Sequence, residues 1–212
     1  MSGCGCEENI KFDGVSVGYK RALWAVIAIN GIMFLVEMTA GMFASSQALK
    51  ADALDFLGDT ATYMITLTVI GMPLMWRARA ALFKGLSLGF MGIWVLGSTV
   101  YSTLILGVPQ AGMMGAIGFL ALVANLVSVL LLLQHRDGDA NVRSVWLCSR
   151  NDAIGNMAVI LAASGVWATS TAWPDLIVAA VMAGLFLWSS MQIVNQAIRE
   201  LRTQQPAVGA VE

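Results

Sequence analysis

The chain has 212 residues, of which 58% are hydrophobic and 12% are charged, and its formal net charge is −1 at pH 7. A soluble globular domain usually carries about twice this share of charged residues, so the composition indicates a membrane protein. The near-neutral charge and the lack of a long basic patch argue against a nucleic-acid partner. Residues 1–19 are polar and hold no apolar core of a secretory signal peptide.

Six apolar runs follow, each about as long as the roughly 20 residues that cross a bilayer as a helix. They lie at about 22–44, 49–71, 83–107, 111–134, 144–168 and 174–197. The connections are short, so neighbouring helices should pack antiparallel. Gly85 and Gly89 have the spacing of a close contact between helices. The sequence therefore predicts an all-α membrane protein, a bundle of six transmembrane helices.

Basic residues gather on one side of this predicted bundle. Ten of the twelve Lys and Arg residues fall before the first run, after the last, or at the connections that follow the second and fourth runs. Lys50 lies on the other side and Arg150 within a run. Because basic residues in short loops mark the cytoplasmic side, we expect both termini in the cytoplasm. The expected organisation is a tail at 1–19, a transmembrane domain at 20–199 and a tail at 200–212, in a bacterial inner membrane.

Ionisable side chains inside spanning helices are costly and usually mark a functional site. Three runs contain them: Glu37 in the first, Asp52, Asp55 and Asp59 in the second, and Arg150 and Asp152 in the fifth, just after Cys148. Asp55 and Asp59 are four residues apart, as are Cys148 and Asp152, so each pair lies on one helix face. A rise of about 1.5 Å per residue puts Asp59 and Asp152 near the middle of the bilayer.

If the two pairs face each other, they offer three carboxylates and one thiol, a set that suits a tetrahedral divalent ion. Like carboxylates in a low dielectric repel, so some must be protonated when the site is empty, and metal and protons then displace each other. One buried aspartate alone could instead donate a hydrogen bond between helices, but two pairs at matched spacing and depth favour a metal site. Arg150 should neutralise a carboxylate or extend to the interface.

Two motifs connect these residues to a known family. The stretch SQALKADALDFLGD at 46–59 matches the pattern Ser-x-Ala-Leu-x-Ala-Asp-Ala-x-[His/Asp]-x-x-x-Asp, and CSRNDAIGN at 148–156 is similar to His-x-x-x-Asp-Ala-x-x-[Ser/Asn]. Both patterns are those of the cation diffusion facilitator family, which the chain resembles over about residues 20–200. The resemblance implies metal binding at Asp55, Asp59, Cys148 and Asp152. Further candidate accessory residues are Glu37, Asp52, Cys4 and Cys6.

Three features depart from the family pattern. Cys148 stands in place of the usual histidine, and Asp55 in place of the histidine of zinc-selective members, so the metal range should widen toward cadmium. The connection that contains His135 is not histidine-rich, and His135 is expected to be a solvated loop residue. Since about a dozen residues follow Arg199, we expect no cytoplasmic metal-binding domain of the kind that usually follows the sixth helix, so a homodimer would have to form through the transmembrane helices.

The sequence thus predicts a transporter that exports Zn²⁺, and also Cd²⁺, from the cytoplasm in exchange for protons, with Co²⁺, Fe²⁺ and Mn²⁺ left open as cargo. We expect no resident cofactor and no enzyme, since neither a Ser/His/Asp set nor a His-Glu-x-x-His motif occurs. One alternative is a permease that relays metal through Cys4, Cys6 and Cys148, although it would have no use for paired aspartates. Another is a metal sensor or scaffold in the membrane without flux. Cys4 and Cys6 either capture a soft metal or lie in a disordered tail.

Overall fold

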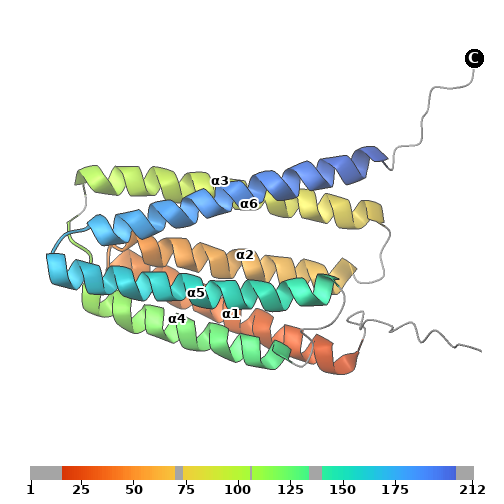
Figure 1. Ribbon diagram of the computed structural model, residues 1–212, viewed down its shortest axis with the longest axis horizontal. Helices are drawn as coiled ribbons and strands as arrows, with labels where there is room; N and C mark the ends of the chain where they lie inside the picture. The colour runs from red at the N-terminus through yellow and green to blue at the C-terminus, as the bar shows by residue number, and fades with distance from the viewer. Residues whose placement is uncertain (1–15, 70–73, 106, 134–139, 204–212) are drawn as a thin grey trace, which may run out of the picture.

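The computed structural model (Figure 1) describes residues 16–69, 74–105, 107–133 and 140–203. For parts of its helices, including 140–148 and 150–151, only the backbone is described. The described residues form six helices and no strand: α1 (Val17–Phe43), α2 (Gln47–Val69), α3 (Leu74–Ile105), α4 (Ala111–Leu132), α5 (Ala140–Thr169) and α6 (Trp173–Thr203). The predicted all-α bundle of six helices is confirmed. The predicted tails and domain limits stay predictions, because residues 1–15 and 204–212 are outside the described ranges.

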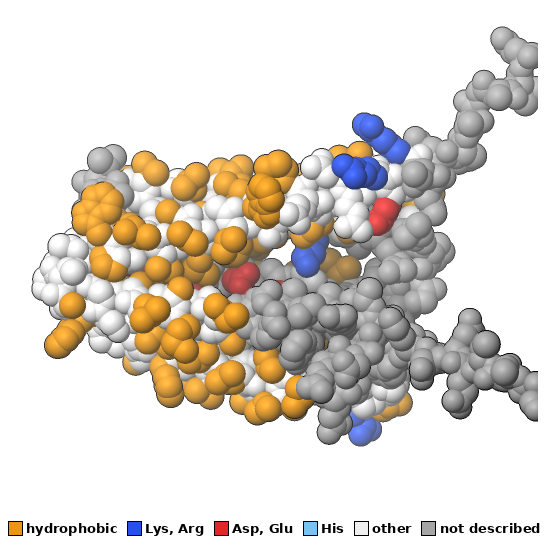
Figure 2. All heavy atoms as spheres, in the orientation of Figure 1, with side chains coloured by type: hydrophobic (Ala, Val, Ile, Leu, Met, Phe, Trp, Pro, Cys, Tyr) orange, Lys and Arg blue, Asp and Glu red, His pale blue; other side chains and the backbone are white. Residues whose placement is uncertain are grey.

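Five of the six helices contain a stretch that is long and apolar enough to cross a membrane, and α2 is the exception. It carries Lys50, Asp52, Asp55 and Asp59 within 23 residues. The surrounding helices shield much of its first half: Ala48, Leu49, Ala51, Asp52 and Ala53 are all buried. Apolar side chains instead cover the outside of the bundle, as Figure 2 shows. The polar helix is therefore kept from lipid by the apolar ones.

The turn between α1 and α2 is tight because α1 ends in a left-handed residue. Ser45 has φ 55°, the Ser45 amide donates to the Met42 carbonyl and the Ser46 amide donates to the Gly41 carbonyl at 3.0 Å. This is the Schellman arrangement of a helix C-terminus. A Cβ atom at Gly41 would lie 3.1 Å from the Lys50 backbone nitrogen, so glycine permits the close approach of α2 there.

The six helices form two groups. In Figure 1, α3 and α6 run side by side along the top of the view, and α1, α2, α4 and α5 lie below them. The contact within the α3/α6 pair is very close: a Cβ atom at Gly85 would lie 2.8 Å from Val194 Cγ2, and one at Gly89 would lie 2.6 Å from Ser190 Oγ. The Ser190 hydroxyl also donates to the Gly85 carbonyl at 2.7 Å. The glycine spacing noted in the sequence thus belongs to the contact between α3 and α6.

The bundle has two distinct ends. The start of α1 and the end of α6 lie at the same end, on the right in Figure 1, together with the ends of α2 and α4 and the starts of α3 and α5. We call this the terminal end. The opposite loop end carries the α1–α2 and α5–α6 connections and the described part of the α3–α4 connection. The first and last helices therefore have their outer ends on one side of the bundle, as six antiparallel helices require.

Candidate metal site

A cavity of about 400 Å³ lies between the α3/α6 pair and helices α2 and α5. It extends from the middle of the bundle toward the terminal end, and Figure 2 shows the hollow there with acidic and basic side chains inside it. Its polar lining residues are Asp55, Asp59 and Thr62 of α2, Lys84 and Ser87 of α3, Asp152 of α5 and Ser189 of α6. Met91, Met182 and Phe186 are among the apolar residues that line it. Acidic groups from two helices thus share one space.

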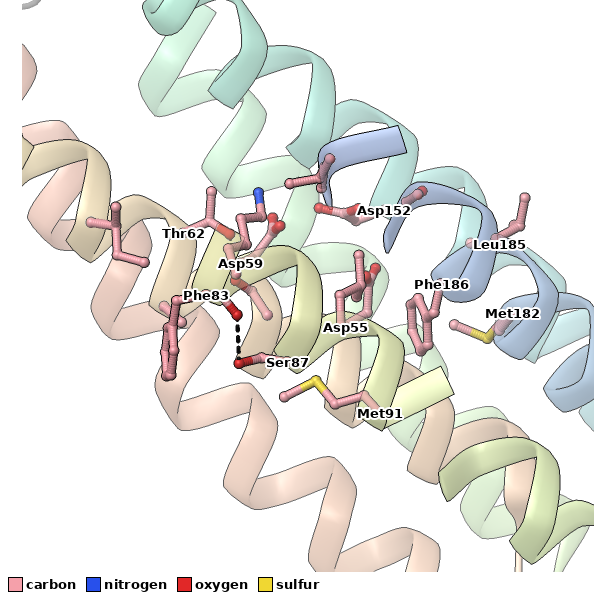
Figure 3. Close-up of a pocket in the computed structure, with 18 residues that line it drawn as sticks. Asp55, Asp59, Thr62, Phe83, Ser87, Met91, Asp152, Met182, Leu185 and Phe186 are labelled. Carbon is pink, nitrogen blue, oxygen red and sulfur yellow. Dashed lines mark hydrogen bonds between the residues drawn. The ribbon is translucent and has the colours of Figure 1, made fainter. Parts of the chain in front are cut away.

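Three aspartates gather in this cavity. Asp55 and Asp59 lie one turn apart on α2, and the Asp152 carboxyl of α5 lies close enough to interact with both. In Figure 3 the three side chains surround the same space. The Tyr63 hydroxyl donates to the Asp59 carboxylate. Carboxylates that face one another in a low dielectric repel, so this arrangement favours bound protons or a cation.

The turn of α5 that precedes Asp152 also faces α2. Ser149 is fully buried, and its hydroxyl lies 3.4 Å from the Tyr63 hydroxyl. The backbone of Cys148 belongs to the same turn, but its side chain is outside the described part of the structure, as is that of Arg150. Cys4, Cys6 and His135 lie entirely outside the described residues. The structure therefore brings together three of the four predicted ligands and leaves the thiol unplaced.

No ready-made metal-ligating group of three or more His, Cys, Asp or Glu residues occurs among the described side chains. The three aspartates share a cavity, and Asp152 interacts with the other two. A metal would have to displace the protons that these carboxyls hold, since a coordinating carboxyl must lose its proton. The four-ligand site stays a prediction from the sequence.

The accessory candidates Glu37 and Asp52 form a separate pair between α1 and α2. They are 0% and 1% exposed and lie close enough to interact electrostatically. Neither carboxylate oxygen of Glu37 has a hydrogen-bond partner among the described residues. Asp52 precedes Asp55 by three residues, about one turn closer to the loop end. The pair is therefore next to the aspartate cavity but sealed from it by packing, because neither residue lines the cavity.

Several polar residues of this region were not apparent from the sequence. Lys84 stands at the start of an apolar run and looked like a marker of the cytoplasmic side, but α3 begins at Leu74, so Lys84 lies inside the helix and lines the cavity. Its charge acts on both Asp55 and Asp59. Buried amides without described partners add to the set: Asn30, Asn125 and Asn156. Uncharged asparagines occur in spanning helices without a functional role. Of the three, only Asn156 could be singled out from the sequence, because it lies inside the second motif.

The comparison with known proteins decides the family. The family model of the cation efflux transmembrane domain matches residues 76–202, well over half of the chain. The chain belongs to the cation diffusion facilitator family. The match confirms the resemblance seen in the two motifs and covers α3 to α6, including Asp152, whereas Asp55 and Asp59 precede it. A chain of this family with these apolar helices is a multi-pass membrane protein, and the matched family model is that of a cation efflux domain.

Individual relatives agree with the family. The chain is 27% identical over 187 residues to the metal cation efflux system protein CzcD of Cupriavidus metallidurans, covering 80% of this chain and 57% of that protein. It is 27% identical over 201 residues to the zinc transporter ZitB of Escherichia coli, covering 88% and 64%. It is 23% identical over 203 residues to the cadmium, cobalt and zinc/H(+)-K(+) antiporter of Bacillus subtilis, again covering 88% and 64%. The chain thus spans less than two thirds of the length of these relatives.

Proposed function

We propose that the protein is a divalent metal cation transporter that exports zinc, and also cadmium, from the cytoplasm in exchange for protons. The observation that carries this proposal is the group of three aspartates from α2 and α5 that line one cavity inside the helix bundle. The relatives' names support the cargo, since they name zinc, cadmium and cobalt, and one names a proton antiporter. Cobalt, iron and manganese remain candidate cargoes. The metal is cargo, and we propose no resident cofactor.

The proposed ligands are Asp55, Asp59, Cys148 and Asp152. Four such groups suit tetrahedral zinc, and the thiolate favours softer ions, which extends the range to cadmium. In the empty site the carboxyls hold protons in their hydrogen bonds. An incoming metal displaces these protons, and protons that enter from the other side displace the metal in turn. The exchange of metal for protons thus follows because the same ligands bind either the metal ion or protons, but not both at once.

The position of the cavity supports the entry of metal from the terminal end. It extends toward the terminal end, where Phe83, Lys84 and Ile193 line it. If the termini are cytoplasmic, as the basic residues indicate, the structure corresponds to a state that receives metal from the cytoplasm. The location in a bacterial inner membrane and a homodimer formed through the transmembrane helices belong to the same proposal. Glu37 and Asp52, one turn closer to the loop end, would serve metal on its way out.

Uptake of zinc into inverted membrane vesicles tests the function. We expect uptake that depends on a pH gradient, and we expect Asp152→Asn to abolish it, because the amide keeps the size of the side chain but cannot bind a metal as an anion. Glu200→Gln is the matched control: it makes the same kind of change on α6, where Glu200 accepts a hydrogen bond from the Gln196 amide and does not line the cavity. Zinc binding without uptake in the unsubstituted protein would instead favour a sensor or scaffold.

A further inference from the structure

A buried carboxylate at the loop end connects two helices that are distant in the sequence. Asp175 lies in the first turn of α6 and is 0% exposed. Its Oδ1 accepts from the Ser46 hydroxyl at 2.6 Å and from the Ala48 amide at 3.0 Å, and its Oδ2 accepts from the Gln47 amide at 2.7 Å. A helix N-terminus is normally capped by a residue that directly precedes it. Here Ser46 does so, since its hydroxyl accepts from the Leu49 amide at 3.1 Å, and a side chain of α6 caps two further amides of α2.

The side chain of Gln47 makes a second connection at the same place. It is 2% exposed. Its Nε2 donates to the Ser102 hydroxyl at 2.6 Å, and its Oε1 accepts from the Ser98 hydroxyl at 3.0 Å. Both serines belong to α3. The first turn of α2 is therefore held by both members of the α3/α6 pair through five hydrogen bonds.

These contacts close the bundle at the end opposite to the cavity. Toward the terminal end the cavity separates α2 from the α3/α6 pair, whereas at the loop end the same helices are joined by hydrogen bonds to a carboxylate, which are stronger than neutral ones. Lys50, half-buried one turn along α2, adds an attractive charge near Asp175. The acidic residues of α2 lead from Asp59 through Asp52 toward this closed end. A metal that leaves between α2 and the pair must pass it.

We propose that Asp175 and Gln47, with Ser46, Ala48, Ser98 and Ser102, form an outer latch that holds the α3/α6 pair against α2 while the site is open to the terminal end, and that releases to let the metal out. This rests on the proposed function, because an exporter must expose its site to each side in turn, which transporters achieve by rocking one group of helices against another. Asp175 is then a positioning residue, which acts on the pathway without contacting the metal.

Labelling from the loop end tests the latch. Ala51 is fully buried one turn beyond the capped end of α2, so Ala51→Cys places a thiol behind the latch. A membrane-impermeant maleimide is added to right-side-out vesicles, and mass spectrometry identifies the labelled residue, so the native cysteines can stay. We expect slow labelling without zinc, and labelling several-fold faster when zinc is being transported, because the latch opens in each cycle. A purely structural cap would show no dependence on zinc.

Asp175→Asn in the same protein should raise the zinc-free labelling rate several-fold, because the amide has one acceptor oxygen and would turn a donor toward the donors of α2. Thr171→Ala is the matched control in the α5–α6 connection, since its hydroxyl pairs with Thr169 and not with α2, and it should leave labelling unchanged. If Asp175→Asn does not fold, the Ser98→Ala/Ser102→Ala double variant removes only the α3 contacts and should have the same effect to a smaller degree.

The outcomes separate the latch from the transport proposal. Equal labelling in all variants, with and without zinc, for a protein that takes up zinc in the inverted-vesicle assay would overturn the latch and leave the function standing. An unsubstituted protein that takes up no zinc would count against the function, and the zinc-free comparison of Asp175→Asn with Thr171→Ala would still decide whether Asp175 closes the loop end.

Discussion

The two ends of the bundle differ in how the α3/α6 pair meets α2. At the loop end, Asp175 and Gln47 fix the contact with hydrogen bonds whose partners all belong to the protein. Toward the terminal end, Asp55 and Asp59 face a cavity that Asp152 also lines. The acidic groups at the two ends thus have different surroundings. Asp175 is held by donors of α2 and joins the helices, whereas the aspartates of the cavity line a space that a cation can enter.

In this account α3 and α6 move together as one rigid unit. Their contact depends on closely packed glycines, so a larger residue at one of these glycines tests whether the unit holds together. Gly85→Val would place its Cβ 2.8 Å from Val194 Cγ2 and 3.2 Å from the Val194 backbone nitrogen. We expect this overpacking to destabilise the protein by about 1–3 kcal/mol, seen as a lower melting temperature in nanodiscs. Gly97→Val, on the same helix with nothing within 4 Å, should melt like the unsubstituted protein. Equal melting of the two variants would mean that the pair separates easily.

The chemistry of the cavity can be sharpened through the predicted thiol ligand. Cys148→Ser replaces a soft ligand by a hard and weak one, so cadmium affinity should fall by about tenfold more than zinc affinity. Competitive binding of the two metals to the purified protein measures the ratio. Cys148→His should shift the preference toward zinc. An unchanged cadmium-to-zinc ratio in Cys148→Ser would remove the thiol from the site and leave the three aspartates.

The smallest expected effect concerns the cation that lines the cavity. The positive charge of Lys84 attracts the carboxylates of Asp55 and Asp59. It therefore repels a metal ion that binds to the same carboxylates. Lys84→Gln should raise zinc affinity by about two- to fivefold at low salt. The effect should be smaller at high salt, because dissolved ions screen the repulsion between the lysine and the metal. Arg79→Gln is the control, since Arg79 is exposed and lies over the Trp76 ring 5.6 Å from its centre. Lower affinity in Lys84→Gln would show that Lys84 supports the site instead.

Much of this architecture was predictable because it follows from local periodicity. Long apolar runs identified the six helices, and the four-residue spacing of Asp55 and Asp59 put two carboxylates on one face. The roles of Lys84 and Asp175 could not be predicted, because they depend on tertiary contacts. Lys84 belongs to α3, which begins well before the apolar run that predicted it. Asp175 lies in the first turn of α6, where an acidic residue is common and gives no sign of a contact with another helix. Its partners lie on α2, 127 to 129 residues away in the chain.

Calorimetric zinc binding to the purified protein tests the central claim, that Asp55, Asp59, Asp152 and Cys148 bind one metal in place of protons. Titrations in buffers of different ionisation enthalpy should show protons released on binding, with affinity that falls as pH drops. The Asp59→Asn/Asp152→Asn double variant should lose more than about 100-fold in zinc affinity. In metal sites, the loss of a residue that only hydrogen-bonds to a ligand already costs about 10–100-fold, and here two ligands are changed. Unimpaired zinc binding in this variant, or binding without proton release, would contradict both the site and the exchange.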